Sequence, residues 1–181
     1  MSKIHKDMTK ILFDAETIQN RIKELGKEIT KDYEGKRPVI VCILRGAVVF
    51  MTDLVRAIDL PLEIDFFSIS SYGSSTKSSG IVKIRKDIDT DISGRDVIVV
   101  EDIVDTGLSL EYIYEYLKHH NVKSAKVCVL LDKPKAHKVD IKIDYRGFDI
   151  GNEFVIGYGL DYDEIYRNIP YIGILKEEIY K

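Results

Sequence analysis

The residues most suited to chemistry follow one apolar run. Two adjacent carboxylates, Glu101 and Asp102, come directly after the apolar residues 97–100, and the segment 105–109 (Asp-Thr-Gly-Leu-Ser) then opens a predicted helix. Neighbouring acids at a strand end repel each other unless a cation or hydroxyl donors satisfy them. Backbone N–H groups and two hydroxyls at a helix N-terminus suit a phosphate. The run therefore predicts a site for ribose hydroxyls, or for Mg²⁺ bound to them, beside a phosphate.

A simpler explanation is that the two acids lie on the surface and that residues 106–107 only cap a helix. It suffices for an acidic pair alone, but the whole run after a buried strand favours a functional site. The run is not a Walker A loop, because Gly-Lys-Ser/Thr is missing, and it is not a dinucleotide fingerprint, because G-x-G-x-x-G is absent.

Helices and apolar strands surround this run. Ile18, Ile22, Leu25 and Ile29 share one helical face, and Asp14 is suited to cap that helix. Continuous β-branched runs are typical of strands that are buried on both faces. We expect strands at 38–44, 62–70, 81–84, 96–100, 125–131, 140–145 and 154–156, and further helices at 47–58 and 108–119.

This order predicts the fold class. Alternating strands and helices favour an α/β fold with a doubly wound, mainly parallel sheet and helices on both faces. The 181 residues suit a single domain. The turn-rich C-terminal third, about 133–181, is predicted to form a small hood over the sheet together with the N-terminal residues.

One polar segment interrupts the pattern. Residues 71–80 (SYGSSTKSSG) are small and flexible, which is compatible with a linker between domains. A strand pattern resumes at 81, however, and neither half of the chain looks complete alone. The segment is therefore predicted to be a mobile functional loop, a lid over a site.

The composition limits the kinds of partner and the cellular location that we expect. The net charge is −3 and the pI is about 5.8, so nothing in the overall charge suggests binding to nucleic acid or to a membrane. Cys42 and Cys128 lie in apolar runs, which indicates buried free thiols in a reducing compartment. No apolar run approaches membrane-span length, and the start lacks a secretory signal. The expected location is the cytoplasm.

Several motifs together resemble one family. The run at 97–109 resembles the 5-phosphoribosyl 1-diphosphate (PRPP) motif of type I phosphoribosyltransferases. Four other stretches resemble the hypoxanthine-guanine branch, in its bacterial form: its pyrophosphate loop at 44–46, the start of its mobile loop at 70–73, its purine-reading lysine at 131–134, and its purine hood at 154–168. The departures are Arg45, where many relatives carry Lys, Leu108, where some relatives, notably mammalian ones, carry Lys, and Asn152-Glu153 in place of the more usual Asp-Lys.

The resemblance implies a purine-salvage enzyme of type I phosphoribosyltransferase fold. Such an enzyme transfers phosphoribose from PRPP to N9 of hypoxanthine or guanine, and gives IMP or GMP plus pyrophosphate. It implies Mg²⁺ as the cofactor, no nucleic-acid or membrane partner, and a homodimer or homotetramer. A tyrosine-rich helix at 108–119 is a possible subunit interface.

The resemblance also implies the site residues. It makes Asp105 the catalytic proton acceptor near purine N7, and Glu101, Asp102 and Asp161 the residues that hold Mg²⁺. Lys133 donates to the purine O6 and so selects oxopurines over adenine. The substrate-binding residues that it implies are Arg45, Gly46, Ser71, Tyr72, Glu101, Asp102, Thr106, Gly107, Leu108, Ser109, Lys133, Phe154, Val155, Asp161 and Arg167.

The remaining roles follow the same resemblance. Arg45, the N–H of Gly46, and Arg167 bind the diphosphate, and residues 105–109 hold the 5-phosphate. Phe154 stacks on the purine, and the backbone of Val155 reads its edge.

Each role has a simpler alternative. Lys133 would otherwise be an exposed turn lysine, Phe154 a core residue, and Arg167 the partner of a surface acid. The histidines His119, His120 and His137 have no metal-ligand spacing and are interpreted as surface residues. For the whole chain, the alternative function is a regulatory nucleic-acid-binding protein that keeps a PRPP motif, and an adenine or orotate transferase fits less well.

Overall fold

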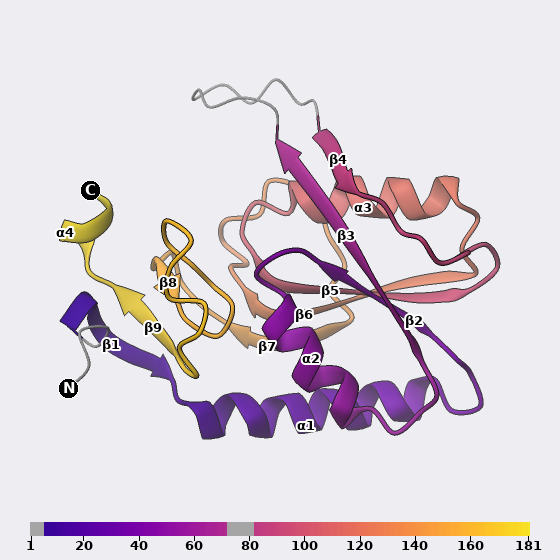
Figure 1. Cartoon of the computed structure of the whole chain (residues 1–181), viewed down its shortest axis with the longest axis horizontal. Coiled ribbons are helices and arrows are strands. Elements are labelled where there is room, and N and C mark those ends of the chain that lie inside the picture. Colours follow the sequence, from indigo (N-terminus) through magenta and orange to yellow (C-terminus); the bar gives the residue numbers. More distant parts are fainter. Residues whose placement is uncertain (1–5, 72–81) are drawn as a thin grey trace.

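The computed structural model describes residues 6–71 and 82–181 (Figure 1). A six-stranded sheet in the order β4-β3-β2-β5-β6-β7 forms its centre. All neighbouring strands are parallel except β3 and β4, which pair antiparallel. The strands are β2 (Val39–Ile43), β3 (Glu63–Ser71), β4 (Val82–Lys86), β5 (Asp96–Val104), β6 (Ser124–Asp132) and β7 (Tyr145–Asp149).

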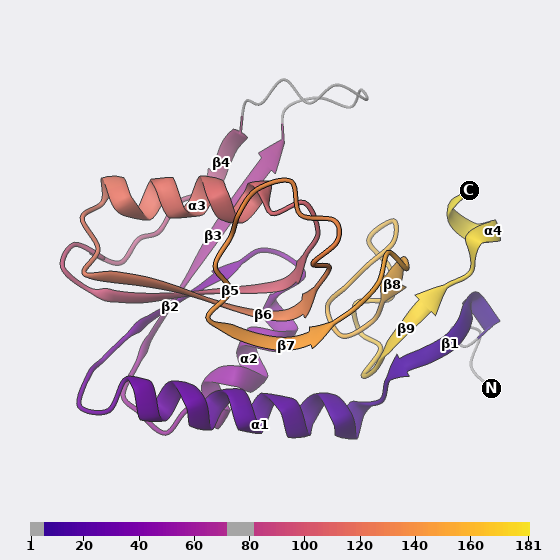
Figure 2. The same ribbon diagram turned by 180° about the vertical axis from the view of Figure 1, so that it is seen from behind.

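Helices cover both faces of this sheet, as Figures 1 and 2 show. Helices α1 (Ala15–Asp32) and α2 (Val48–Ala57) lie on one face, and α3 (Leu108–His119) lies on the other. Alternate strand residues divide between the two cores: Ile40 and Ile98 pack with α1 and α2, whereas Val41 and Val99 pack with α3. The predicted doubly wound, mainly parallel α/β fold is confirmed.

Local signals explain why the long helix begins where it does. Asp14 accepts a hydrogen bond at 2.8 Å from the N–H of Thr17, which satisfies one of the unpaired donors of the first turn. The predicted apolar face of α1 is fully buried.

A second, smaller sheet lies beside the first. It has the order β1-β9-β8, with antiparallel pairing throughout, and consists of β1 (Met8–Phe13), β9 (Ile172–Leu175) and β8 (Val155–Ile156). The short helix α4 (Glu177–Tyr180) follows β9, so both ends of the described chain lie at this sheet (Figure 1). Strands β1 and β9 are not predicted by any local pattern, because they pair with each other across more than 150 positions of the chain.

Two strand predictions need correction. The alternating residues 140–144 form a loop, and the strand expected there is instead β7, at Tyr145–Asp149. Strand β5 runs to Val104 rather than ending at residue 100, so the acidic pair lies inside the strand. The predicted mobile loop lies outside the described residues, apart from Ser71 at the end of β3.

The described part of the chain agrees with one further expectation. Cys42 and Cys128 are both buried and free. Within residues 6–71 and 82–181, no helix combines the length and the apolar character that a membrane crossing requires.

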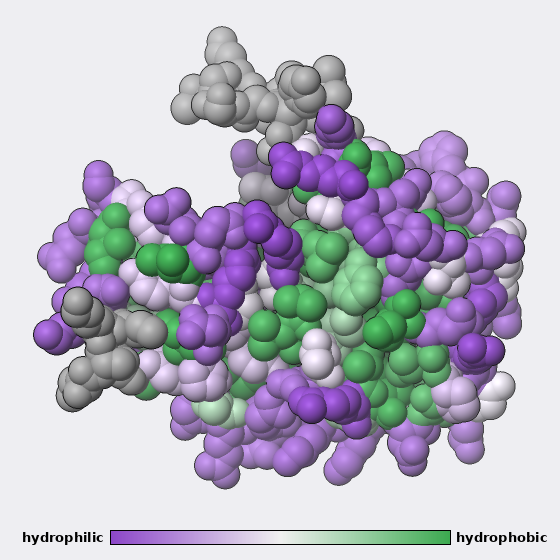
Figure 3. Space-filling model, viewed as in Figure 1, coloured by the Kyte–Doolittle hydropathy of each residue, from purple (hydrophilic) through white to green (hydrophobic). Residues whose placement is uncertain are grey.

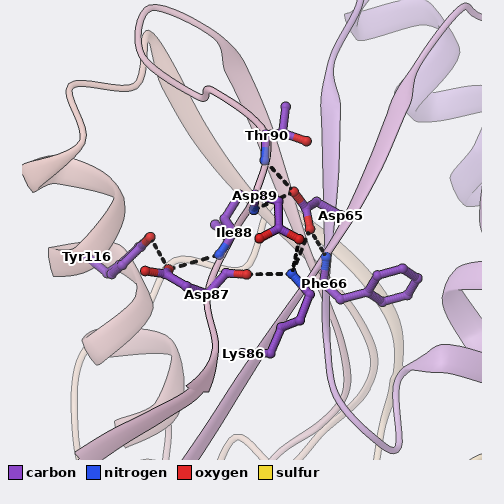
Figure 4. A network of polar contacts seen from close by, with 8 residues as sticks. All are labelled: Asp65, Phe66, Lys86, Asp87, Ile88, Asp89, Thr90 and Tyr116. Atoms are coloured by element: carbon purple, nitrogen blue, oxygen red, sulfur yellow. Dashed lines mark hydrogen bonds and ion pairs between the residues drawn. The ribbon is translucent and has the colours of Figure 1, made fainter.

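A polar network ties the start of β3 to the segment that follows β4 (Figure 4). The buried carboxylate of Asp65 accepts hydrogen bonds from the N–H groups of Phe66, Asp89 and Thr90 at 2.7–2.9 Å, and Lys86 Nζ lies 3.4 Å away. Burial alone would raise the pKa of Asp65, but the donors of Thr90 and Phe66 and the charge of Lys86 outweigh it and hold this pKa below its usual value.

We expect Asp65→Asn to destabilise the fold by about 2 kcal/mol near neutral pH, because charge-assisted hydrogen bonds to a buried carboxylate are lost. That corresponds to a fall in Tm of about 4–8 °C for a chain of this size. The contribution of Asp65 is present above its unfolded pKa and is lost as the pH falls below about 4, so the difference between the two proteins should shrink there. Thermal unfolding of both proteins at several pH values measures the loss of stability near neutral pH and its decrease at low pH.

The matched control is Asp89→Asn. The Asp89 carboxylate also contacts Lys86, at 2.8 Å, but its side chain is 85% exposed. Exposed pairs contribute little, so this variant should lose less than about 1 kcal/mol. Equal losses in the two variants would contradict the role given to the buried Asp65.

Candidate active site

The predicted acid and the predicted base-reading lysine meet at two neighbouring strand ends. Val104 of β5 pairs with Asp132 of β6, and the N–H of Lys133 donates to the Val104 carbonyl at 2.9 Å. This register brings Lys133 Nζ to 3.5 Å from Asp105 Oδ2. The Lys133 side chain is only 11% exposed, so it is not an exposed turn lysine, whereas Asp105 is 58% exposed. Ligands bind at this edge of open parallel sheets.

The acidic pair of β5 is partly buried. Burial, and to a lesser extent the neighbouring Asp102 charge, raises the pKa of Glu101 to about 8. Burial raises the pKa of Asp102 to about 6, although the N–H of Ile103 and the charge of Arg167 oppose it. Two carboxyls with raised pKa values side by side indicate a place where a cation would be favourable.

The loop after β2 approaches Asp102 closely. A side chain on Gly46 would overlap the Asp102 carboxylate, and one on Gly159 would overlap the Gly46 carbonyl. Only glycine allows both approaches, because it has no Cβ. The Leu44–Arg45 peptide just before this glycine is cis. The structure therefore brings together the β2 loop, the acidic pair of β5 and the turn that contains Gly159.

Four charged residues link that loop to the segment 161–167. Arg45 Nη2 lies 2.7 Å from Glu164 Oε1, and Arg167 Nη2 lies 3.3 Å from Glu164 Oε2 and 2.9 Å from Asp161 Oδ1. Asp161 and Arg167 also lie close enough to shift the pKa of Asp102. Arg45, Asp102, Asp161 and Arg167 thus share one site. No sequence motif predicts Glu164 as a site residue, because its contact with Arg45 spans more than 100 residues of the chain.

The N-terminus of α3 has the predicted form. Gly107 is the residue before the helix and adopts a left-handed conformation with φ of 83°. The positive φ favours glycine here, and a side chain would also displace the tip of Ile141. The carbonyl of Thr106 accepts from the N–H of Lys138 at 2.9 Å, which holds the turn against the segment after β6. Leu108 is 46% exposed, and Ser109 is also exposed.

Phe154 lies directly before β8, where another aromatic ring covers it. The Tyr180 ring of α4 stacks on Phe154 with centroids 4.8 Å apart, and Tyr162 meets it edge-on at 5.7 Å. Val155 is buried in β8. Tyr180 is a second residue that the sequence analysis did not place at the site, because nothing local links it to Phe154.

His137 corrects a prediction. The sequence predicts a surface residue, whereas His137 Nε2 lies 2.7 Å from Oδ1 of Asp132, which is fully buried. Arg146 Nε lies 3.1 Å from the other Asp132 oxygen. His137 and Arg146 thus hold the residue directly before Lys133. For the remaining predicted residues, Ser71 ends β3, and Tyr72 lies outside the described part of the chain.

The described residues contain no group of three or more His, Cys, Asp or Glu side chains that could hold a metal by themselves. This donor set still fits magnesium, because Mg²⁺ usually binds one or two carboxylates and takes its other ligands from substrate phosphates and water. Glu101 and Asp102, with their raised pKa values, are suitable carboxylates for such a shared site.

Comparisons with known proteins agree with this geometry. The model of the phosphoribosyl transferase domain matches residues 8–163. The chain belongs to the phosphoribosyltransferase family. At 55% identity over 177 residues, covering 98% of each protein, it is similar to the hypoxanthine-guanine phosphoribosyltransferase of Streptococcus thermophilus.

Two further relatives show the same likeness. The protein of that name from Bacillus subtilis is 51% identical over 175 residues and covers 97% of each chain. The crystal structure of a hypoxanthine phosphoribosyltransferase from Staphylococcus aureus superposes with a TM-score of 0.96. It is 49% identical, with 99% of this chain and 98% of that chain covered.

Proposed function

We propose that this protein is a purine-salvage phosphoribosyltransferase that joins the phosphoribose of PRPP to N9 of hypoxanthine or guanine. The products are IMP or GMP and pyrophosphate. The observation that supports it most strongly is the contact of Lys133 with Asp105 at the ends of β5 and β6, in a chain of this family. A cationic donor beside a proton acceptor suits a base with a carbonyl at O6 and a nitrogen that gains or loses a proton.

On this proposal the base contacts the β6 end and the hood. Lys133 donates to O6, and Asp105 accepts or shares a proton at N7. The Phe154 ring lies against the purine face, and the backbone of Val155 contacts the ring edge. Adenine presents an amino donor where the oxopurines present O6, so it would give the Lys133 ammonium no acceptor on the base.

On the same proposal, the phosphate groups of PRPP bind at the N-terminus of α3 and at the loop after β2. The N-terminus of α3, with Thr106 and Ser109, holds the 5-phosphate. Arg45, the N–H of Gly46 and Arg167 hold the diphosphate, so that its negative charge is neutralised as it leaves. Glu101 and Asp102 bind the ribose hydroxyls.

Magnesium is part of this proposal. Glu101, Asp102 and Asp161 are the residues that would hold it, and when bound it supplies positive charge to the leaving diphosphate. The roles of Ser71 and Tyr72 and of a closing loop stay predictions.

We also propose that residues 1–181 form one domain, with a hood from about 133–181 and the N-terminal strand, and that the enzyme is cytoplasmic. Assembly into a homodimer or homotetramer is supported by an apolar surface. Figure 3 shows apolar side chains gathered over α2 and β3, where Val48 and Ile64 are 36% and 49% exposed. Exposed apolar patches commonly mark protein interfaces. Light scattering after size exclusion gives the oligomeric state.

The direct test is to incubate the protein with PRPP and Mg²⁺ and with hypoxanthine, guanine, xanthine or adenine in turn, and to measure nucleotide and pyrophosphate. We expect nucleotide with hypoxanthine or guanine, much less with adenine, and none when a chelator removes the metal. Failure to form any nucleotide would overturn the proposal. No observation favours the nucleic-acid-binding alternative, since the chain carries a net charge of −3.

A further inference from the structure

Glu164 takes part in no proposed step, yet its carboxylate lies between two arginines assigned to the diphosphate. It contacts Arg45 Nη2 at 2.7 Å and Arg167 Nη2 at 3.3 Å. Within the part of the chain that the structure describes, Glu164 is the only polar partner of the Arg45 side chain. Arg167 has two further partners, the Asp161 carboxylate and the Gly159 carbonyl. Glu164 therefore controls Arg45 more than it controls Arg167.

The backbone that presents Glu164 is unusual. Five non-glycine residues of the described chain have positive φ, and four of them lie between Tyr158 and Tyr166, including Asp163 at 51° and Glu164 at 63°. A positive φ is uncommon in residues other than glycine, and several such residues close together must be stabilised by contacts with the surrounding structure. Here the N–H of Glu164 donates to Asp161 Oδ2 at 3.0 Å, which fixes the turn and aims the carboxylate at the arginines.

Charge and chemistry suggest what the contact does. A carboxylate bridging two guanidiniums occupies the same donors that bind a phosphate oxygen. The Arg45 and Glu164 side chains are 67% and 56% exposed, so their pairing is weak enough to be exchanged.

We propose that Glu164 is an internal competitor for the diphosphate-binding arginines: its carboxylate holds Arg45 and Arg167 until the diphosphate of PRPP displaces it, and it returns when pyrophosphate leaves. This rests on the proposed function, because it requires that these arginines bind a diphosphate. The consequence is weaker binding of pyrophosphate and therefore easier product release.

The test is the affinity for magnesium pyrophosphate, measured by calorimetry at fixed ionic strength. One exposed ion pair contributes less free energy than a tenfold change in affinity represents. Pyrophosphate must displace Glu164 from two such pairs, with Arg45 and with Arg167. Glu164→Gln should therefore bind pyrophosphate about 3- to 10-fold more tightly. In steady state, inhibition by pyrophosphate should strengthen by the same factor. Glu164→Asp keeps the charge but has a shorter side chain, so its affinity for pyrophosphate should lie between those of the unchanged protein and Glu164→Gln.

Asp163→Asn is the matched control. It removes the same charge one residue away, from an exposed side chain with the same left-handed backbone and without an ion pair among the described residues. It should change the affinity by less than about 2-fold. A second control places Glu164→Gln in an Arg45→Met background, where most of the gain should disappear because the pair being exchanged is absent.

The outcomes separate the two proposals. If the unchanged protein does not bind magnesium pyrophosphate, the proposed function fails and this inference fails with it. If it binds, but Glu164→Gln binds equally or more weakly, Glu164 supports the arginines rather than competing for them. If Asp163→Asn gains as much as Glu164→Gln, the effect is general electrostatics, and the competitor role is also wrong.

Discussion

Asp105→Asn is expected to lower kcat by about 10²–10⁴, the range for loss of a general acid–base group. The substitution keeps the shape of the side chain and removes its capacity to accept a proton. Asp105 is 58% exposed at the end of β5, with its Oδ2 3.5 Å from Lys133 Nζ, so the loss falls on the reacting base rather than on the core. The measurement is steady-state kinetics with hypoxanthine and PRPP.

The KM for PRPP distinguishes catalysis from binding in this experiment. It should change little, because the hydroxyls and N–H groups of the α3 N-terminus are untouched. Asp59→Asn, an exposed change after α2, is the control and should behave like the unchanged protein. Near-normal kcat in Asp105→Asn would show that Asp105 is not the proton acceptor.

Lys133→Met is expected to lower kcat/KM for hypoxanthine by roughly 10- to 150-fold. Loss of a hydrogen bond from a charged donor costs about 1.5–3 kcal/mol, which corresponds to that factor. Methionine has a similar length and suits the largely buried position, since the Lys133 side chain is 11% exposed. Activity with adenine should not fall in parallel, because adenine presents no acceptor to this ammonium.

The comparison of two bases makes the Lys133 experiment specific. Lys135→Met, in the exposed part of the same turn, is the control and should leave both bases unaffected. An equal drop for hypoxanthine and adenine in Lys133→Met would mean that Lys133 serves structure or PRPP binding instead of reading the base.

Local patterns were sufficient for the framework that carries this site. The Asp14 cap and the spacing of Ile18 and Ile22 predicted α1 because a helix repeats every few residues, and the apolar runs of β2 and β5 predicted strands covered on both faces. The motif at 101–109 identified the start of α3 beside which Asp105 lies, although the end of β5 was predicted four residues too early. Its family resemblance, rather than spacing, supplied the individual roles.

Tertiary structure decided the features that join distant segments. The pairing of β1 with β9, the bridge of Glu164 to Arg45 and the stacking of Tyr180 on Phe154 involve no repeating pattern that a sequence displays. The extension of β5 through the acidic pair likewise depends on its neighbour β6, which continues the hydrogen bonding to Asp132. Periodicity reports which face of an element is buried, whereas the identity of the partner across that face is set only when the chain folds.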